Sequence, residues 1–394
     1  MSPPPPPPTP PPPKALPPAK YPPLQPSYIL RGHAQPIHSL TFLCNNTHLL
    51  SADAAGICIL WTLSTRRPLA VWASHTASIL SVAEWTPVSP SGSTDQRIIT
   101  HGRDHKLRVW KFPRPSDDVA SALPIDNGGS ITGRAPWLVS ALSVNALNFC
   151  GFAHCPVRDE DPDTEGYTPT LIAVPSPLES AAVDIFSLPS TTRVHARIQA
   201  STQTGMAMAL SLHWVAEVLT LIAGYESGHV VVFSHQEGVW NETYISQAHT
   251  QPVLGLSVAP QGEWILTTAA DALLVRHALG QEGAGKKVDT KHAGQQAVAV
   301  RSDGKIFATA GWDGRFRVFS AKTMKELAVL KWHTVGCYAV AFAEILADKE
   351  GDGQAGTEVA RPLSVDEARV GRESGKHWIA GGAKDGKVSL WEVY

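Results

Sequence analysis

Histidine, aspartate and hydroxyl side chains recur together along this chain of 394 residues. The clearest set is His75, Thr100 and Asp104, which is followed by Trp110. A hydroxyl, an imidazole and a carboxylate are the groups with which hydrolases build an activated nucleophile. In this set Asp104 stands six residues, and Thr100 ten residues, before the tryptophan. Whether the spacing is unique or repeated decides between a catalytic and a structural function.

The spacing is repeated. Counting back six residues from aromatic anchor positions gives Asp104, Asp271, Asp313 and Asp385, and counting back ten gives Ser51, Thr100, Thr267 and Thr309. A nucleophile needs exposure and an oxyanion hole, whereas repeated polar positions favour buried hydrogen bonds that fix a turn. Only the set that ends at Trp110 is complete in the sequence. We expect structural networks, and no catalytic residue, at His75, Thr100, Asp104 and Trp110, at His292, Thr309 and Asp313, and at His333, Asp385 and Trp391.

Three other motifs fail on their context. Residues 351–356 have the spacing GxGxxG, but no expected strand leads into them and no suitable helix follows. The acidic residues from Asp348 onward begin like a calcium loop, yet Val359 stands where a bidentate Glu is required. Cys150, His154 and Cys155 lack a fourth zinc ligand and the usual short cysteine spacing. We therefore expect no cofactor and no metal site.

The polar sets belong to a longer repeat. A histidine, an apolar strand pattern, a tight turn and a strand ending at Trp, His or Phe recur in the stretches 33–61, 75–110, 249–277, 292–319 and 333–391. A repeat of about 40–45 residues with this layout is typical of a four-stranded propeller blade. Two further blades are expected without the histidine and tryptophan. The strands of blade three are predicted at 144–149, 171–174 and 183–186, and those of blade four at 206–212, 219–223 and 229–233.

The sequence thus predicts an all-β protein, a seven-bladed WD-repeat β-propeller in residues 28–394. The last blade is one strand short, so the apolar segment 28–30 is expected to close the ring and to cover an exposed edge. Residues 1–27 are a proline-rich tail, which we expect to be disordered, or alternatively to be a ligand for an aromatic groove. The remaining length is expected in loop insertions at 113–134, 156–170 and 344–376.

Composition narrows the function classes. The net charge of −2 offers no basic surface to a phosphate backbone, so no direct nucleic-acid binding is expected. No apolar run approaches the roughly 18 residues of a membrane span, and no signal-peptide pattern opens the chain, so no membrane partner is expected. Five cysteines without a CxxC pair fit free thiols in a reducing, intracellular compartment. A protein-docking surface without a small-molecule substrate remains.

The residue before each turn aspartate is expected to project from the same rim of the ring. These residues are Arg103, Trp312 and Lys384, and Glu226, beside Tyr225, occupies the equivalent place in blade four. An aromatic side chain and two cations that converge on one channel are typical of a protein-interaction hot spot. The alternative is that Trp312 packs between blades and that the charges are merely solvated.

Longer strings resemble a known family. They are GYESGHVVVF at 224–233, ATAGWDGRFRVF at 308–319 and KDGKVSLW at 384–391, with Arg31-Gly32-His33 and Arg66-Arg67-Pro68 near the start. Nearly all of residues 28–394 is similar to the ASTRA-associated protein 1 family, fungal WD-repeat proteins that are similar to the animal Gβ-like protein 1. The chain departs from the general WD pattern, because no Trp-Asp dipeptide ends a repeat: Thr62, Lys111 and Glu392 follow the terminal tryptophans.

The resemblance implies a non-enzymatic subunit of the nuclear ASTRA assembly. It also implies links to chromatin remodelling and to the Tel2–Tti1–Tti2 cochaperone, which matures phosphatidylinositol-kinase-like kinases. An alternative is a direct reader of histone or phosphorylated peptides, which would need an aromatic cage, an acidic face or an arginine cluster. A Gβ-type signalling subunit would need a long N-terminal helix, which the proline tail excludes.

Overall fold

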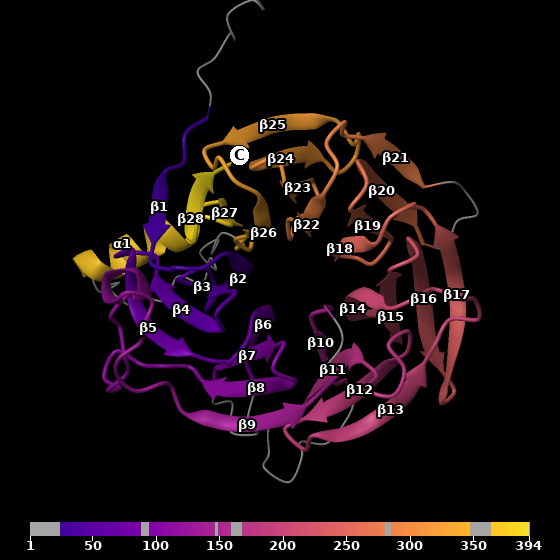
Figure 1. The fold of residues 1–394 in the computed structure, drawn as a ribbon, viewed down its shortest axis with the longest axis horizontal. Coiled ribbons are helices and arrows are strands. Elements are labelled where there is room, and N and C mark those ends of the chain that lie inside the picture. Colours follow the sequence, from indigo (N-terminus) through magenta and orange to yellow (C-terminus); the bar gives the residue numbers. More distant parts are fainter. Residues whose placement is uncertain are drawn as a thin grey trace, which may run out of the picture.

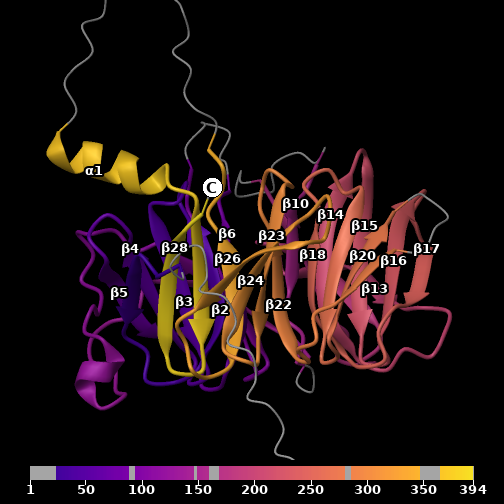
Figure 2. The same cartoon turned by 90° about the horizontal axis from the view of Figure 1, so that it is seen from above.

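Seven four-stranded sheets form a ring in the computed structural model, which describes residues 24–87, 94–145, 149–158, 168–279, 285–346 and 364–393. Figure 1 looks down the axis of this ring, and the sequence runs once around it from β2 to β28. Figure 2 shows the ring from its edge, as a disc whose strands run across its thickness. The predicted all-β, seven-bladed propeller is confirmed.

Each of the first four blades is built from consecutive strands. Blade 1 contains β2 (Ile37–Leu43), β3 (His48–Asp53), β4 (Ile57–Thr62) and β5 (Arg67–Ala73). Blade 2 contains β6 (Ile79–Trp85), β7 (Arg97–Gly102), β8 (Lys106–Lys111) and β9 (Leu138–Ser143). Blade 3 contains β10 (Ala153–Pro156), β11 (Thr170–Pro175), β12 (Val183–Leu188) and β13 (Thr192–Ile198). Blade 4 contains β14 (Ala207–Val215), β15 (Val218–Tyr225), β16 (His229–Gln236) and β17 (Val239–Gln247).

Blades 5 and 6 are also built from consecutive strands, whereas blade 7 combines strands from both ends of the described chain. Blade 5 contains β18 (Val253–Val258), β19 (Trp264–Ala269), β20 (Leu273–Ala278) and β21 (Lys286–Asp289). Blade 6 contains β22 (Gln295–Val300), β23 (Ile306–Gly311), β24 (Arg315–Ser320) and β25 (Glu326–Lys331). Blade 7 contains β26 (Cys337–Phe342), β27 (Trp378–Ala383), β28 (Lys387–Glu392) and β1 (Tyr28–Arg31).

The hydrophobic core lies between the blades. Second strands such as β7, β11, β19 and β27 are buried at every residue, because each is covered on both faces by neighbouring blades. The outer strand β17 instead alternates between exposed and half-buried residues, as expected where only one face is covered. One core cluster joins Ile37 and Leu49 of blade 1 to Trp378 and Ala380 of blade 7. Apolar contacts of this kind hold the ring together.

Strand β1 closes the ring, as predicted from the sequence. It pairs antiparallel with β28, with Tyr28 opposite Leu390 and Arg31 opposite Lys387. The backbone N–H of Ser27 extends the ladder by donating to the carbonyl of Leu390 at 2.8 Å. Closure satisfies the backbone groups of β28, which would otherwise form an unpaired edge.

One strand prediction is wrong, and one predicted insertion overlaps the ends of two strands. The first strand of blade 3 is β10, whereas the prediction placed it at 144–149. Val144 lies in the core where the chain leaves β9, Phe149 is exposed, and neither is in a strand; residues 146–148 lie outside the described ranges. The predicted insertion 156–170 begins inside β10 and ends inside β11, because Pro156 and Thr170 are paired to each other.

The insertion 344–376 is not wholly a loop, because it contains helix α1 (Val365–Ser374). A capping box starts the helix: Ser364 Oγ accepts from the Glu367 N–H, and the Glu367 carboxylate accepts from the Ser364 N–H. Almost all of α1 is exposed, and it lies outside the disc in Figure 2. Because the helix buries almost nothing, its sequence has no apolar stripe that would have predicted it, although the capping pattern is present. A short 3₁₀ helix, Pro124–Asn127, likewise interrupts the insertion 113–134.

Several predictions fall on residues that the structure does not describe. They concern the tail up to residue 23, most of the insertion 156–170 and the motifs within 348–359. Within the described ranges, no helix has the length and apolar character that crossing a membrane requires.

Candidate functional site

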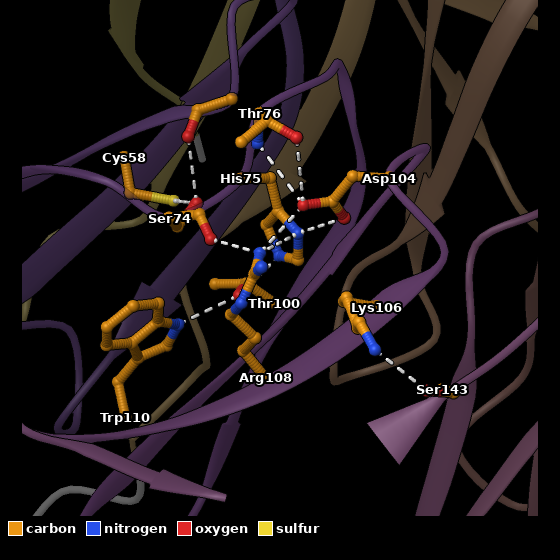
Figure 3. A network of polar contacts seen from close by, with 11 residues as sticks. Cys58, Ser74, His75, Thr76, Thr100, Asp104, Lys106, Arg108, Trp110 and Ser143 are labelled. Atoms are coloured by element: carbon orange, nitrogen blue, oxygen red, sulfur yellow. Dashed lines mark hydrogen bonds and ion pairs between the residues drawn. The ribbon is translucent and has the colours of Figure 1, made fainter. Parts of the chain in front are cut away.

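The set His75, Thr100, Asp104 and Trp110 meets in blade 2, as Figure 3 shows. His75 Nδ1 lies 2.7 Å from Asp104 Oδ1, and His75 Nε2 lies 2.9 Å from Thr100 Oγ1. The Trp110 indole N–H donates to the same hydroxyl oxygen at 2.9 Å. A neutral imidazole that donates from Nδ1 accepts at Nε2, so the hydrogen bonds run from Trp110 through Thr100 and His75 to Asp104.

Electrostatics fix this network in one protonation state. Arg108 Nη1 donates to Asp104 Oδ2 at 2.9 Å and to the Ser74 carbonyl at 2.7 Å. Burial opposes ionisation of Asp104, but hydrogen bonds from His75 and Arg108 outweigh it and lower the pKa of the carboxyl to about 2. Burial also lowers the pKa of His75, which favours the neutral imidazole. The Thr100 hydroxyl is buried and fully engaged, so it has neither the exposure nor the free base that a nucleophile requires.

Blade 1 holds an equivalent network that the sequence reasoning missed. His33 Nδ1 lies 2.8 Å from Asp53 Oδ2, and His33 Nε2 lies 2.7 Å from Ser51 Oγ. Trp61 Nε1 donates to Ser51 Oγ at 2.8 Å. The carboxylate comes from the last residue of β3, two positions earlier than the repeat predicted, where Ala55 stands. Asp53 Oδ1 reaches forward to accept the Ala55 N–H at 2.9 Å, so it still organises the turn.

Blade 5 completes its network with a histidine in place of tryptophan. His249 Nδ1 lies 3.2 Å from Asp271, and His249 Nε2 lies 2.9 Å from Thr267 Oγ1. His277 Nε2 takes the place of the indole, 2.8 Å from the same hydroxyl. Burial lowers the pKa of His277 to about 3, so this ring is neutral. Its Nδ1 lies 2.9 Å from the Tyr244 hydroxyl, which holds the ring in place.

Blade 7 takes its hydroxyl from the opposite strand. His333 Nδ1 lies 3.2 Å from Asp385, and its Nε2 lies 3.0 Å from Ser389 Oγ, which also accepts from Trp391 Nε1 at 2.9 Å. The position ten residues before Trp391 is Gly381, and Gly381 pairs directly with Ser389 across β27 and β28. The hydroxyl therefore occupies the same place from the neighbouring strand. The sequence indicated that only the set in blade 2 is complete, but blade 7 also has a complete network.

The predicted network of His292, Thr309 and Asp313 does not form in blade 6. Arg317 takes the carboxylate of Asp313 instead, with an Nη2–Oδ2 distance of 2.6 Å. His292 lies 3.8 Å from Asp313 and is half-exposed. The Thr309 hydroxyl is buried without a partner among the described residues. Phe319 replaces the tryptophan in this blade, so the indole N–H that the hydroxyl accepts in other blades is missing.

Four of the five predicted rim residues are exposed: Arg103, Glu226, Trp312 and Lys384. Tyr225 is not, because its side chain is 0% exposed in the core between blades 3 and 4. It ends β15, where the side chain faces the neighbouring blade, so its place on the rim is a wrong prediction.

Trp312 lies at the edge of a hollow of about 340 Å³ on this face of the ring. The indole is 46% exposed; it packs against Gly294 on one side, where any Cβ would collide with the ring, and its N–H donates to Gln296 Oε1 at 2.9 Å. Trp312 is thus packed on one side and exposed elsewhere, so it combines features of both interpretations made from the sequence. The hollow is lined by His38, Ile79, Leu80, Phe149, Gln296, Trp312 and Tyr338.

A larger hollow, of about 740 Å³, lies on the outer edge of blade 2, beside the insertion 113–134. Trp137 on its wall is 76% exposed. No group of three or more His, Cys, Asp or Glu side chains in the described ranges is arranged to hold a metal ion. Cys150 and Cys155 are buried, and burial raises the pKa of the Cys155 thiol to about 12.

Comparison with known proteins identifies the family. The family model of ASTRA-associated protein 1 matches residues 26–335. A relative of that name from Aspergillus flavus is 43% identical and covers 95% of this chain and 98% of its own length. Its namesake from Verticillium alfalfae is 45% identical over 94% of this chain and 93% of its own length, and that from Schizosaccharomyces pombe is 32% identical over 94% and 99%. The chain therefore belongs to the ASTRA-associated protein 1 family.

Proposed function

We propose that this protein is a non-catalytic scaffold subunit of the ASTRA assembly and that it holds partner proteins on the rim formed by Arg103, Trp312 and Lys384. The supporting observation is the division of polar residues in the ring. In blades 1, 2, 5 and 7, the hydroxyl, imidazole and carboxylate groups that could do chemistry are hydrogen-bonded to one another in buried networks. The side chains exposed at Arg103, Trp312 and Lys384 are an aromatic ring and two cations, which suit recognition.

The finer parts of the proposal come from the family resemblance. They are a nuclear location, a link to chromatin remodelling and work with the Tel2–Tti1–Tti2 cochaperone on phosphatidylinositol-kinase-like kinases. The name of the relatives supports association with a protein complex. Fluorescence microscopy of the tagged chain is expected to show a nuclear signal, and a purely cytoplasmic signal would contradict this location.

Affinity purification followed by mass spectrometry tests the assembly. The tagged wild-type chain is expected to recover ASTRA and cochaperone subunits. The triple variant Arg103→Ala, Trp312→Ala and Lys384→Ala is expected to lose them while staying soluble and melting within a few degrees of the wild type. Trp137→Ala is the matched control, because it removes an exposed indole at the outer edge of blade 2. Full recovery of the partners by the triple variant would place the binding surface elsewhere.

A direct reader of histone tails is less well supported. Histone tails are basic, and the rim beside the hollow presents the cations Arg103 and Lys384. The guanidinium of Arg103 already lies 4.4 Å from the centre of the Phe149 ring, so a cation occupies that aromatic face. Like charges would meet on docking.

A further inference from the structure

We propose that the hollow beside Trp312 receives one large apolar side chain from an acidic segment of a partner protein, whose carboxylates face Arg103 and Lys384. This inference rests on the proposed scaffold function and specifies the chemistry of the partner. Three features carry it: the exposed aromatic side chains of the hollow, the unbalanced charge around it and the fixed backbone of its rim.

The hollow is lined by aromatic and aliphatic side chains, some of them partly uncovered, together with the polar side chains of His38 and Gln296. Trp312 is 46% and Phe149 51% exposed, although both are large hydrophobic side chains. Ile79 and Leu80 also line the hollow, and Tyr338 meets the His38 ring edge-on, with 5.8 Å between the ring centres. Burial lowers the pKa of His38, and its Nδ1 lies 2.8 Å from Ser78 Oγ, so the imidazole favours its neutral form. A side chain the size of Phe or Leu would contact the exposed Trp312 and Phe149 rings there and reduce their exposed apolar surface.

The charge around the hollow is unbalanced. The aspartate on each adjoining turn is already paired with a neighbouring side chain, and the contacts are Asp104 with His75 and Arg108, Asp313 with Arg317, and Asp385 with His333. None of the residues that line the hollow is a carboxylate. Among the described residues, none forms an ion pair with Arg103 or Lys384. The free charges on this part of the rim are therefore positive, and they fit an acidic partner.

The rim is fixed before any partner arrives. The backbone N–H of Arg103 donates to Ser78, that of Trp312 to Gly294 and that of Lys384 to Gly336, each at 2.9 Å and each to the carbonyl of the residue directly before the first strand of its blade. The same contact recurs in three blades, so these positions need little ordering on binding. Preorganisation of this kind lowers the entropic cost of association.

Peptide binding to the purified full chain tests the inference by fluorescence anisotropy. The probe is a synthetic peptide of Asp and Glu residues around a central Phe. Its counterparts carry Ala in place of Phe, Asn and Gln in place of the acids, Lys in place of the acids, or phosphoserine in place of the acids together with a central Ala. The probe should bind roughly 10- to 150-fold more tightly than the Ala counterpart, from the burial of one ring. It should also lose affinity as salt is added.

Variants connect the binding to the residues. Trp312→Ala should abolish the preference for Phe, whereas Trp312→Phe should retain most of it. Arg103→Glu with Lys384→Glu should weaken binding of the acidic probe, by up to roughly fivefold for each cation, and strengthen binding of the Lys counterpart. Trp137→Ala and Lys325→Glu are the controls: one removes an exposed indole at the outer edge, and the other reverses an exposed cation in the turn between β24 and β25. Near-UV circular dichroism verifies that each variant is folded.

Each contrary result has one meaning. Equal binding of the Phe and Ala peptides overturns the apolar anchor, and tighter binding of the Lys counterpart overturns the acidic partner. Binding of the phosphoserine peptide alone would assign the rim to phosphate instead. The measurement uses no other subunit, so its failure together with intact copurification would overturn the hollow and leave assembly membership standing. Loss of copurification with intact peptide binding would overturn assembly membership and leave the binding hollow standing.

Discussion

Removal of the Asp104 carboxylate tests whether the polar networks hold the ring together. In the variant Asp104→Ala, His75 Nδ1 and the Thr76 N–H lose an acceptor, and Arg108 loses its ion pair. The folded state lowers the pKa of Asp104 to about 2 and so favours its carboxylate form, and solvent screening of this partly exposed group keeps the stabilisation below the full shift. Leaving the buried His75 Nδ1 donor without an acceptor costs about 1–3 kcal/mol. We expect the free energy of unfolding to fall by about 1–3 kcal/mol.

The sign of the pH dependence follows from the direction of this shift. The folded-state pKa of Asp104 is depressed, so its contribution is present above the ordinary pKa of 3.8 and is lost as the pH falls towards 2. The difference in unfolding free energy between wild type and Asp104→Ala should be constant at neutral pH. It should shrink once the pH falls below about 4.

Urea unfolding monitored by tryptophan fluorescence measures this difference. The matched control is Asp118→Ala, which removes a carboxylate that is 92% exposed and 3.9 Å from Arg134. An exposed ion pair contributes little, so the control should change the unfolding free energy by no more than about 0.5 kcal/mol. If Asp118→Ala costs as much as Asp104→Ala, the network is not a source of stability, and the argument from burial fails.

Three more predictions follow from burial and pairing. Thr100→Val should cost about 1–3 kcal/mol in urea unfolding, whereas Thr309→Val should be neutral or stabilising, because the Thr309 hydroxyl has no partner among the described residues; equal losses would contradict this. Deletion of residues 1–26 should leave the melting temperature nearly unchanged, and deletion of residues 1–31 should lower it, because only the second removes β1; equal melting temperatures would refute closure by β1. Burial lowers the pKa of His101 to about 3, so the unfolded chain takes up the proton first and stability should fall as the pH drops below 6.5. The variant His101→Leu should lose less stability between pH 7.5 and pH 5.5, and an unchanged pH profile would count against this.

The fold could be predicted because its marks repeat. A single aspartate or tryptophan is weak evidence for a blade. The same spacing between them, repeated along the chain, is strong evidence for a repeated blade. Blade 3 was predicted least accurately because neither repeated position is present there, and the apolar run at 144–149 resembled a strand, whereas the first strand of the blade is β10. Helix α1 was missed because its exposed residues carry no helical stripe of apolar side chains.

Single networks were harder to predict than the fold, because one hydrogen-bonding position can be filled from more than one place in the sequence. Ser389 supplies from β28 the hydroxyl that Thr100 supplies from the second strand of blade 2, and Asp53 reaches the imidazole from inside a strand. Conversely, Thr309 has the expected residue type, but its hydroxyl has no partner among the described residues. Phe319 supplies no N–H to it, and Arg317 pairs with the Asp313 carboxylate. Linear spacing cannot represent cross-strand neighbours, so contacts of this kind need the register of the sheet.

The pairing of β1 with β28 has a consequence for how the protein is made. The two strands lie about 360 residues apart in the chain, with Leu30 opposite Val388. At ribosomal rates of about 5–20 residues per second, β1 waits roughly 20–70 s for its partner to be synthesised. During that time its apolar Leu30 and open backbone are available to other nascent chains. A chain truncated within blade 7 would therefore keep β1 without its partner β28, and its ring could not close.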